Sequence, residues 1–95
     1  MKHLRFECDP RKSLENQRKH DVSFEEAQAV FLDENALMIH DPDHSDDEDR
    51  FVLLGLSAKI RLLTVCHCYR ESDEVIRIIS ARKATRNEQK SYWER

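Results

Sequence analysis

Residues 50–80 read RFVLLGLSAKIRLLTVCHCYRESDEVIRIIS. They contain three apolar runs, over 50–57, 60–69 and 74–80, and the links between the runs are only two and four residues long. Such runs, rich in Leu, Val and Ile, are typical of strands, and strands joined by short links pair antiparallel. The segment therefore predicts a three-stranded meander as the centre of the fold.

The segment before this meander begins with a strand and a helix. Residues 3–8 alternate polar and apolar side chains, as a half-buried strand does. Asp9 is a typical N-cap, and Pro10 suits the first helical position, where its missing N–H costs nothing. We expect the helix to end near Lys19, with Leu14 as its only aliphatic anchor.

Two further helices are predicted from capping signals. Glu26 follows Ser23 at the spacing of a capping box, and apolar side chains then recur at helical spacing. Thr85 and Glu88 repeat the same spacing near the C-terminus. We therefore expect the last helix over residues 84–93.

A short strand over 36–40 and an exposed acidic loop over 41–49 complete the prediction. The expected order is β-α-α-β-β-β-β-α. An α+β fold follows, with a mostly antiparallel sheet of four to five strands. Two N-terminal helices and one C-terminal helix are expected to share one face of that sheet.

The composition indicates one small domain over residues 1–95. No apolar run approaches the ~18–20 residues of a membrane-spanning helix, and the N-terminus has no apolar signal region. Three cysteines, an odd number, suggest reduced thiols. We therefore expect a cytoplasmic protein.

The net charge of −3 is a sum of unlike parts. Residues 1–20 hold six basic and three acidic residues (+3), residues 21–59 hold two and eleven (−9), and residues 60–95 hold eight and five (+3). Nucleic acids bind local basic patches rather than the total charge. The acidic total therefore does not exclude a nucleic-acid ligand.

The last predicted strand places a charge among aliphatic side chains. Strict alternation puts Arg77 and Ile79 on one face and Ile76, Ile78 and Ser80 on the other. A charged side chain in such surroundings is expected to be neutralised, either by a ligand or by a structural partner in the acidic loop.

Three more basic residues, Arg82, Lys83 and Arg86, gather where this strand passes into the last helix. A planar guanidinium group binds phosphate through two parallel N–H donors, and a flexible ammonium group adds a further positive charge. Such groups on a sheet rim can hold an RNA backbone and stabilise a phosphorane-like transition state. The alternative to an RNA-binding role is that these basic residues are solvated side chains at the start of the last helix.

Two histidines are candidates for proton transfer. His67 lies on the strand predicted to pair with that of Arg77, and an imidazole with the ordinary pKa near ~6.5 suits acid–base chemistry. A half-exposed, hydrogen-bonded imidazole is the alternative. His20 ends the first helix, where the helix dipole favours a cation, so capping explains it without catalysis.

Metal and nucleotide-binding motifs are not supported, and we expect no cofactor. The His40–Asp49 segment holds imidazoles and carboxylates but lacks the spacing of a calcium loop. Cys66 and Cys68 stand too close for a zinc knuckle. Gly55 is the only glycine, which excludes a glycine-rich phosphate loop.

Several blocks stand out when taken in order, namely Phe6–Pro10 with Lys12 and Asn16, Lys19–Ala27, Asp49–Phe51, Arg77–Ala84, and Glu88 with Tyr92. Together they resemble the BrnT family of toxins from type II toxin–antitoxin modules. The match spans nearly the whole chain, and RIISARKA at 77–84 is its most specific part. Cys8 stands where the family usually has tryptophan, and Asp21 where it usually has glycine.

The resemblance implies a RelE-like fold and an endoribonuclease that inhibits translation. In RelE-like enzymes the RNA 2′-hydroxyl attacks the adjacent phosphate, and no metal is required. The resemblance also implies a hetero-oligomer with a ribbon-helix-helix antitoxin of the BrnA kind, through which alone DNA is contacted.

The resemblance and the residue chemistry together assign the predicted site. The expected catalytic residues are His67, Arg77 and Arg82, and the expected RNA-binding residues are Arg50, Lys83 and Arg86. The departures at Cys8 and Asp21 are expected to weaken stability or toxicity. A second hypothesis is a non-catalytic partner-binding module that acts as a co-repressor with its antitoxin.

Overall fold

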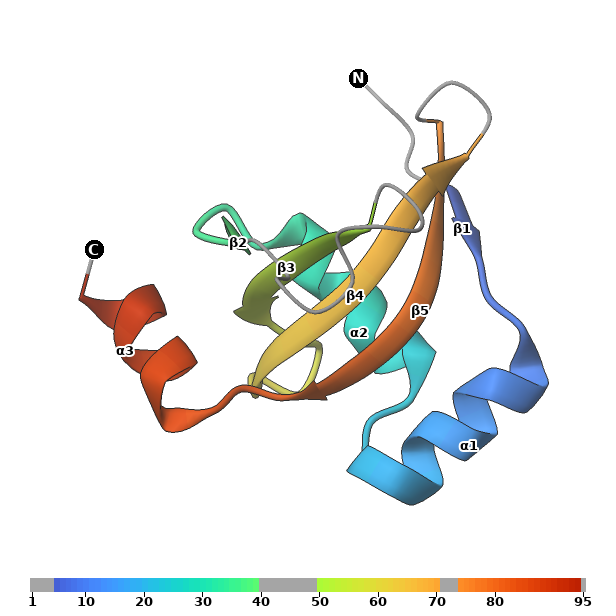
Figure 1. The fold of residues 1–95 in the computed structure, drawn as a ribbon, viewed down its shortest axis with the longest axis horizontal. Helices are drawn as coiled ribbons and strands as arrows, with labels where there is room; N and C mark the ends of the chain where they lie inside the picture. The colour runs from blue at the N-terminus through green and yellow to red at the C-terminus, as the bar shows by residue number, and fades with distance from the viewer. Residues whose placement is uncertain (1–4, 40–49, 71–73, 95) are drawn as a thin grey trace.

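The computed structural model describes residues 5–39, 50–70 and 74–94. Its elements are β1 (Arg5–Glu7), α1 (Pro10–His20), α2 (Phe24–Gln28), the 3-10 helix η1 (Ala29–Leu32), β2 (Leu37–Ile39), β3 (Phe51–Leu56), β4 (Leu62–Arg70), β5 (Val75–Lys83) and α3 (Arg86–Trp93). Figure 1 shows one curved sheet, with α1 and α3 at opposite ends of the molecule. The α+β class is confirmed. His40 and the predicted acidic loop lie outside the described residues.

The five strands form one mixed sheet in the order β1-β5-β4-β3-β2. β3 pairs antiparallel with β4, and β4 with β5, so the predicted meander is confirmed. β2 adds to β3, also antiparallel. β1 pairs parallel with β5, which the local sequence pattern did not indicate. Parallel neighbours need a long crossover, and the chain between β1 and β5 supplies it.

An extra residue in β5 changes which way its side chains face. Ser80 and Ile78 pair with consecutive residues of β4, so Ile79 has no opposite residue. A bulge of this kind shifts the alternation by one residue. Ser80 therefore lies on the face of Arg77, contrary to the prediction from strict alternation. Arg82 lies on that face too.

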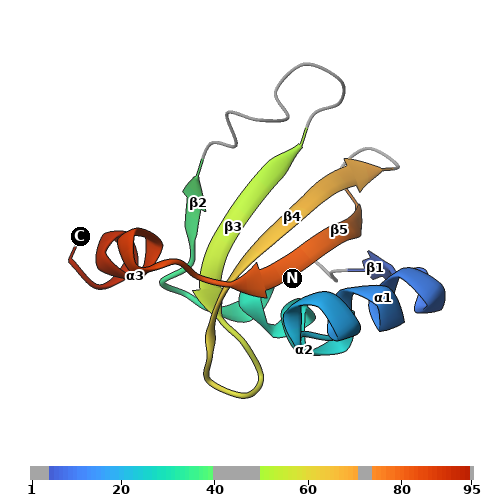
Figure 2. The same cartoon turned by 60° about the horizontal axis from the view of Figure 1, so that its bottom comes forward.

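The main core lies between α2 and one face of the sheet, and Figure 2 shows α2 lying on one side of that sheet. Its buried members are Val22, Phe24, Ala27, Val30, Leu53, Leu63, Val65, Ile76, Ile78 and Ala81. Burial of apolar surface contributes about 25 cal/mol per Å², so this layer is the main stabilising contact of the fold.

α3 packs on the opposite face of the sheet. On β3, Leu53 joins the core under α2, whereas the next residue, Leu54, clusters with Ala84 and Tyr92. Neighbouring residues of a strand point to opposite faces. The expectation that all three helices share one face is therefore wrong. Because β3 is apolar on both faces, each face must be shielded from water by a helix.

α1 is anchored by a polar side chain and not by Leu14, which is 57% exposed. Asn16 is buried, and its Nδ2 donates to the carbonyl oxygens of Val22 at 2.7 Å and of Ala81 at 2.8 Å. Its Oδ1 accepts from the Ala81 N–H at 3.1 Å. β1 pairs only with residues 75–77, so the amide of Asn16 satisfies the edge of β5 that β1 does not reach.

The predicted capping box is complete at α3 and half formed at α2. Thr85 and Glu88 exchange both of its hydrogen bonds. Ser23 accepts from the Glu26 N–H at 3.1 Å, but the Glu26 carboxylate turns to Arg61, whose Nε donates to it at 2.9 Å. A buried carboxylate needs a charged partner. The ion pair with Arg61 is therefore favoured over the second hydrogen bond of the capping box.

Candidate functional site

The face of the sheet opposite α2 carries the basic residues of β5. Ile76, Ile78 and Ala81 join the main core, so Arg77 and Arg82 point the other way. α3 covers only the part of this face around Leu54, Leu56 and Leu62. We call the remaining part the open face, and its side chains come from Cys66, Cys68, Arg77, Ser80 and Arg82.

Three cations line a small pocket at the edge of the open face. Its volume is about 180 Å³, and its walls are Lys12, Arg50, Cys68, Arg77 and Ile79. These residues come from the first turn of α1, the residue before β3, and the strands β4 and β5. Segments far apart in the sequence thus converge here, and we call this the three-cation pocket.

Among the described residues, the cations of this pocket have few neutralising partners. Arg50 Nε is buried and has no hydrogen-bond partner among the described residues. Arg77 forms a long ion pair, with 3.9 Å between its Nε and Glu7 Oε1. A buried polar nitrogen without a partner is costly. The pocket is therefore suited to an anion with several acceptor oxygens.

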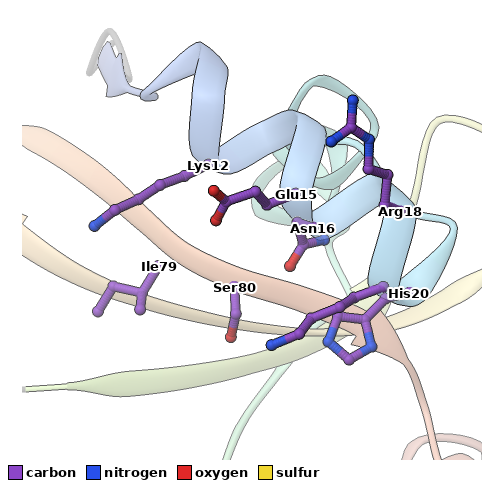
Figure 3. Close-up of a pocket in the computed structure, with 8 residues that line it drawn as sticks. Lys12, Glu15, Asn16, Arg18, His20, Ile79 and Ser80 are labelled. Carbon is purple, nitrogen blue, oxygen red and sulfur yellow. The ribbon is translucent and has the colours of Figure 1, made fainter.

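A larger groove runs along α1 (Figure 3). Its volume is about 500 Å³, and it is lined by Lys12, Glu15, Asn16, Arg18, Lys19 and His20 of α1 and by Ile79 and Ser80 of β5. Lys12 and Ile79 also line the three-cation pocket, so the two cavities adjoin at these side chains. We call this cavity the α1–β5 groove.

Arg82 lies on the open face and is oriented by Glu88 of α3. Its two terminal nitrogens donate to the two carboxylate oxygens at 2.8 and 2.9 Å, which is the bidentate geometry of strong ion pairs. Glu88 also accepts from the Thr64 hydroxyl at 2.9 Å and from the Thr85 N–H at 2.8 Å. The Arg82 side chain stays 41% exposed, so a ligand can still reach it.

We expect the free energy of unfolding to fall as the pH drops from about 5 to about 2. Hydrogen bonds, first from Arg82 and then from Thr85 and Thr64, lower the pKa of Glu88 to about 2. A carboxyl whose pKa is lowered by folding stabilises the protein above its unfolded-state pKa of about 4.3. That stabilisation is lost as the pH falls through the folded-state value.

Urea unfolding at about pH 7, 4 and 2 measures this loss. Glu88→Gln should flatten part of the profile, because its amide does not titrate. A wild-type profile no steeper than that of the variant would contradict the prediction.

Lys83 does not join the other basic residues of β5. It follows Arg82 on the strand, so its side chain points to the other face, where Nζ lies 3.6 Å from Asp21 Oδ2. Arg86 is exposed in the first turn of α3. The structure therefore does not place Lys83 beside Arg77, and the RNA-binding roles of Lys83 and Arg86 stay predictions.

His67 lies in the core, on the face opposite Arg77. It is 0% exposed, and its ring meets the rings of Phe31 and Tyr69 edge-on at centroid distances of 4.7 and 5.2 Å. Burial lowers the pKa of His67 below its usual 6.5, which favours the neutral form. The structure therefore does not bring His67 and Arg77 together, and we do not assign His67 to the site beside Arg77.

The family of the chain follows from a comparison with known proteins. The model of the ribonuclease toxin BrnT of type II toxin–antitoxin systems matches residues 8–88. The chain belongs to the BrnT family. Its fold is similar to the 1.1 Å crystal structure of the Brucella abortus ribonuclease toxin BrnT, with a TM-score of 0.67 and 21% identity over 88% of this chain and 100% of that one. No curated protein matches the sequence.

Family membership makes this chain a toxin of a type II system, which has a cognate antitoxin as its partner. Within the described part of this BrnT-family toxin, no three His, Cys, Asp or Glu side chains gather to hold a metal. None of the described helices has the length and apolar character to span a membrane. The cysteines at 8, 66 and 68 are not joined by disulfide bonds.

The sequence prediction omits the α1 side of this site. Lys12, Glu15 and Lys19 are spaced i, i+3 and i+7, which places them on one helical face. That spacing is readable in the sequence, but a charged stripe usually faces solvent. Only the neighbouring strand β5, brought close by Asn16, turns this stripe into the wall of a groove.

Proposed function

We propose that this BrnT-family toxin is an endoribonuclease that inhibits translation, and that the three-cation pocket holds the phosphate it cleaves. One observation carries the proposal: Lys12, Arg50 and Arg77 converge on one cavity of about 180 Å³. Cations that meet at one point, with few neutralising partners among the described residues, favour a phosphodiester over a neutral ligand. The family's description as a ribonuclease toxin supports RNA as the substrate.

The proposed reaction is a metal-independent transesterification of the RelE-like kind. The 2′-oxygen bonds to the adjacent phosphorus while the bond to the 5′-oxygen breaks, which leaves a 2′,3′-cyclic phosphate and a 5′-hydroxyl. The 2′-hydroxyl proton passes to water, and the Lys12 ammonium protonates the leaving 5′-oxygen. Arg50 and Arg77 stay charged and stabilise the extra negative charge of the transition state.

Arg82 binds a neighbouring phosphate in this proposal. It stands five residues from Arg77 on β5, and a strand rises about 3.3 Å per residue, so the two guanidiniums serve different phosphates. The bidentate contact with Glu88 holds Arg82 in one orientation. Glu88 is then a positioning residue that acts through Arg82.

The departures at Cys8 and Asp21 weaken stability rather than chemistry in this proposal, since neither lines the pocket or the groove. The Cys8 side chain packs against the main core, and its Sγ accepts from Gln28 Nε2 at 3.6 Å. Asp21 ends α1 with φ of 61°, a conformation that favours glycine. Its carboxylate lies 3.4 Å from Arg61, which offsets part of that strain.

The antitoxin we propose is a ribbon-helix-helix protein of the BrnA kind that forms a hetero-oligomer with this toxin. Membership of a type II family supports the antitoxin in general, and the resemblance in the sequence supports its kind. The toxin then contacts DNA only through that partner. A ribonuclease that stops translation acts in the cytoplasm, which is the location we propose.

RNA cleavage in EDTA tests the proposed activity. Purified toxin should cut a free RNA, or an mRNA in a translation extract, into fragments that end in a 2′,3′-cyclic phosphate. Cleavage of free RNA that disappears in EDTA would contradict metal independence. Intact RNA in both assays would contradict the ribonuclease function.

A non-catalytic, co-repressing role is the second candidate. The three-cation pocket is lined by no imidazole or carboxylate within the described part of the chain, and such a lining also suits binding alone. Expression without the antitoxin separates the two functions. A ribonuclease arrests growth, whereas a binding module is tolerated.

A further inference from the structure

We propose that the α1–β5 groove binds one RNA base beside the phosphate in the three-cation pocket, and that Glu15 selects guanine there. This selection rests on the proposed ribonuclease function and gives that function a sequence preference. Three features of the groove point to it: its position next to the pocket, its lysines and its carboxylate.

The groove adjoins the three-cation pocket. Lys12 and Ile79 line both cavities, so an RNA strand with one phosphate in the pocket places its next nucleoside in the groove. A volume of about 500 Å³ lies within the range of sites for small organic ligands. Figure 3 shows Ile79 and Ser80 facing the α1 side chains across it, so an entering base meets the apolar side chain of Ile79 and the hydroxyl of Ser80.

Two lysines of the groove have no ion-pair partner in the described parts of the chain. Lys12 and Lys19 are seven residues apart on α1, or about 10 Å along the helix axis. In contrast, Lys83 and Arg61 lie outside the groove, and both are within 4 Å of the Asp21 carboxylate. Unpaired ammonium groups two helical turns apart can contact the phosphates on either side of one nucleotide.

Glu15 lies between these lysines, about one turn from each. Its carboxylate also lacks a partner within the described ranges, and it offers two acceptor oxygens and no donor. Guanine alone presents two neighbouring N–H donors on its Watson–Crick edge, N1–H and N2–H. Adenine, cytosine and uracil each place an acceptor beside a donor, which a carboxylate repels.

Asn16 fixes the wall from which Glu15 projects. Both hydrogens of its Nδ2 are donated to the carbonyl oxygens of Val22 and Ala81, so the amide does not compete for the base. These bonds tie α1 to β5 and set the distance between the two walls of the groove. A carboxylate on a rigid helix discriminates bases better than one on a loop.

Mapping the cleavage sites in a random-sequence RNA pool tests the selection. The wild type should show a preference of about 10-fold or more for guanine at one position beside the cut. Glutamine offers one acceptor and one donor, so it can pair with the edges of adenine, cytosine and uracil but not with the two donors of guanine. Glu15→Gln should therefore abolish the guanine preference at that position.

Glu34→Gln is the matched control, because Glu34 is exposed in a turn outside the groove and loses the same charge. It should keep the guanine preference. Cleavage without a base preference, or a preference unchanged in Glu15→Gln, overturns the selection and leaves the ribonuclease function intact. A wild type that cuts neither free RNA nor RNA in a translation extract overturns both.

Discussion

Alanine in place of Arg77 is expected to slow RNA cleavage about 10²–10³-fold without unfolding the protein. That is the usual loss when one preorganised group that stabilises transition-state charge is removed. The Arg77 side chain is 35% exposed, and its ion pair with Glu7 spans 3.9 Å. Such a contact contributes little to folding, so activity and stability should separate. Initial cleavage rates in EDTA and thermal unfolding measure the two effects.

Two further variants show whether geometry or charge alone is responsible. Lys59 is exposed in the turn between β3 and β4 and lines neither cavity, so Lys59→Ala should change the rate less than about threefold. Arg77→Lys keeps the charge but loses the planar fork, and its rate should lie between those of wild type and Arg77→Ala. Equal losses in Lys59→Ala and Arg77→Ala would show that long-range charge, and not the pocket, governs cleavage.

Local sequence signals predicted the helices and strands well, because caps and apolar runs depend on neighbouring residues. Thr85 and Glu88 form the predicted capping box, and the meander of β3, β4 and β5 has the predicted order. The sequence did not predict which face of the sheet α3 covers. Leu53 and Leu54 are both apolar, and a strand that is apolar on both faces carries no pattern that tells which helix covers which face.

The candidate site depends on one residue that the sequence does not mark. Arg77 and Arg82 are five residues apart, so strict alternation puts them on opposite faces of the sheet. The unpaired Ile79 brings them to the same face. No glycine or proline stands near it to signal a bulge. The arginines were predicted from their chemistry, whereas their shared face is a property of the paired strands.

The sequence did not indicate the burial of His67, for a related reason. A neutral imidazole is apolar enough to be buried, and alternation from Val65 places His67 in the core. The local sequence contains no sign of the aromatic rings that enclose it, because Phe31 comes from η1. Burial of His67 therefore depends on long-range packing, as the placement of α3 does.

Asn16→Ala is expected to lower the free energy of unfolding by about 3–5 kcal/mol. The substitution removes three hydrogen bonds and leaves the Ala81 N–H and the carbonyl oxygens of Ala81 and Val22 without those partners. A buried group left unsatisfied costs about 1–3 kcal/mol, and a small domain has only about 5–15 kcal/mol in total. Urea unfolding measures the loss.

Leu14→Ala is the matched control on the same helix, because Leu14 is 57% exposed and its truncation should cost less than about 1 kcal/mol. Amide exchange at Ala81 gives a second, local measurement, since its N–H donates to the Asn16 side chain. Asn16→Asp keeps that acceptor but offers no N–H to the two carbonyls, so it should protect the Ala81 amide without restoring stability. If Asn16→Ala cost no more than Leu14→Ala, the edge of β5 would be held by other contacts, and the wall of the α1–β5 groove would lose the anchor that positions Glu15.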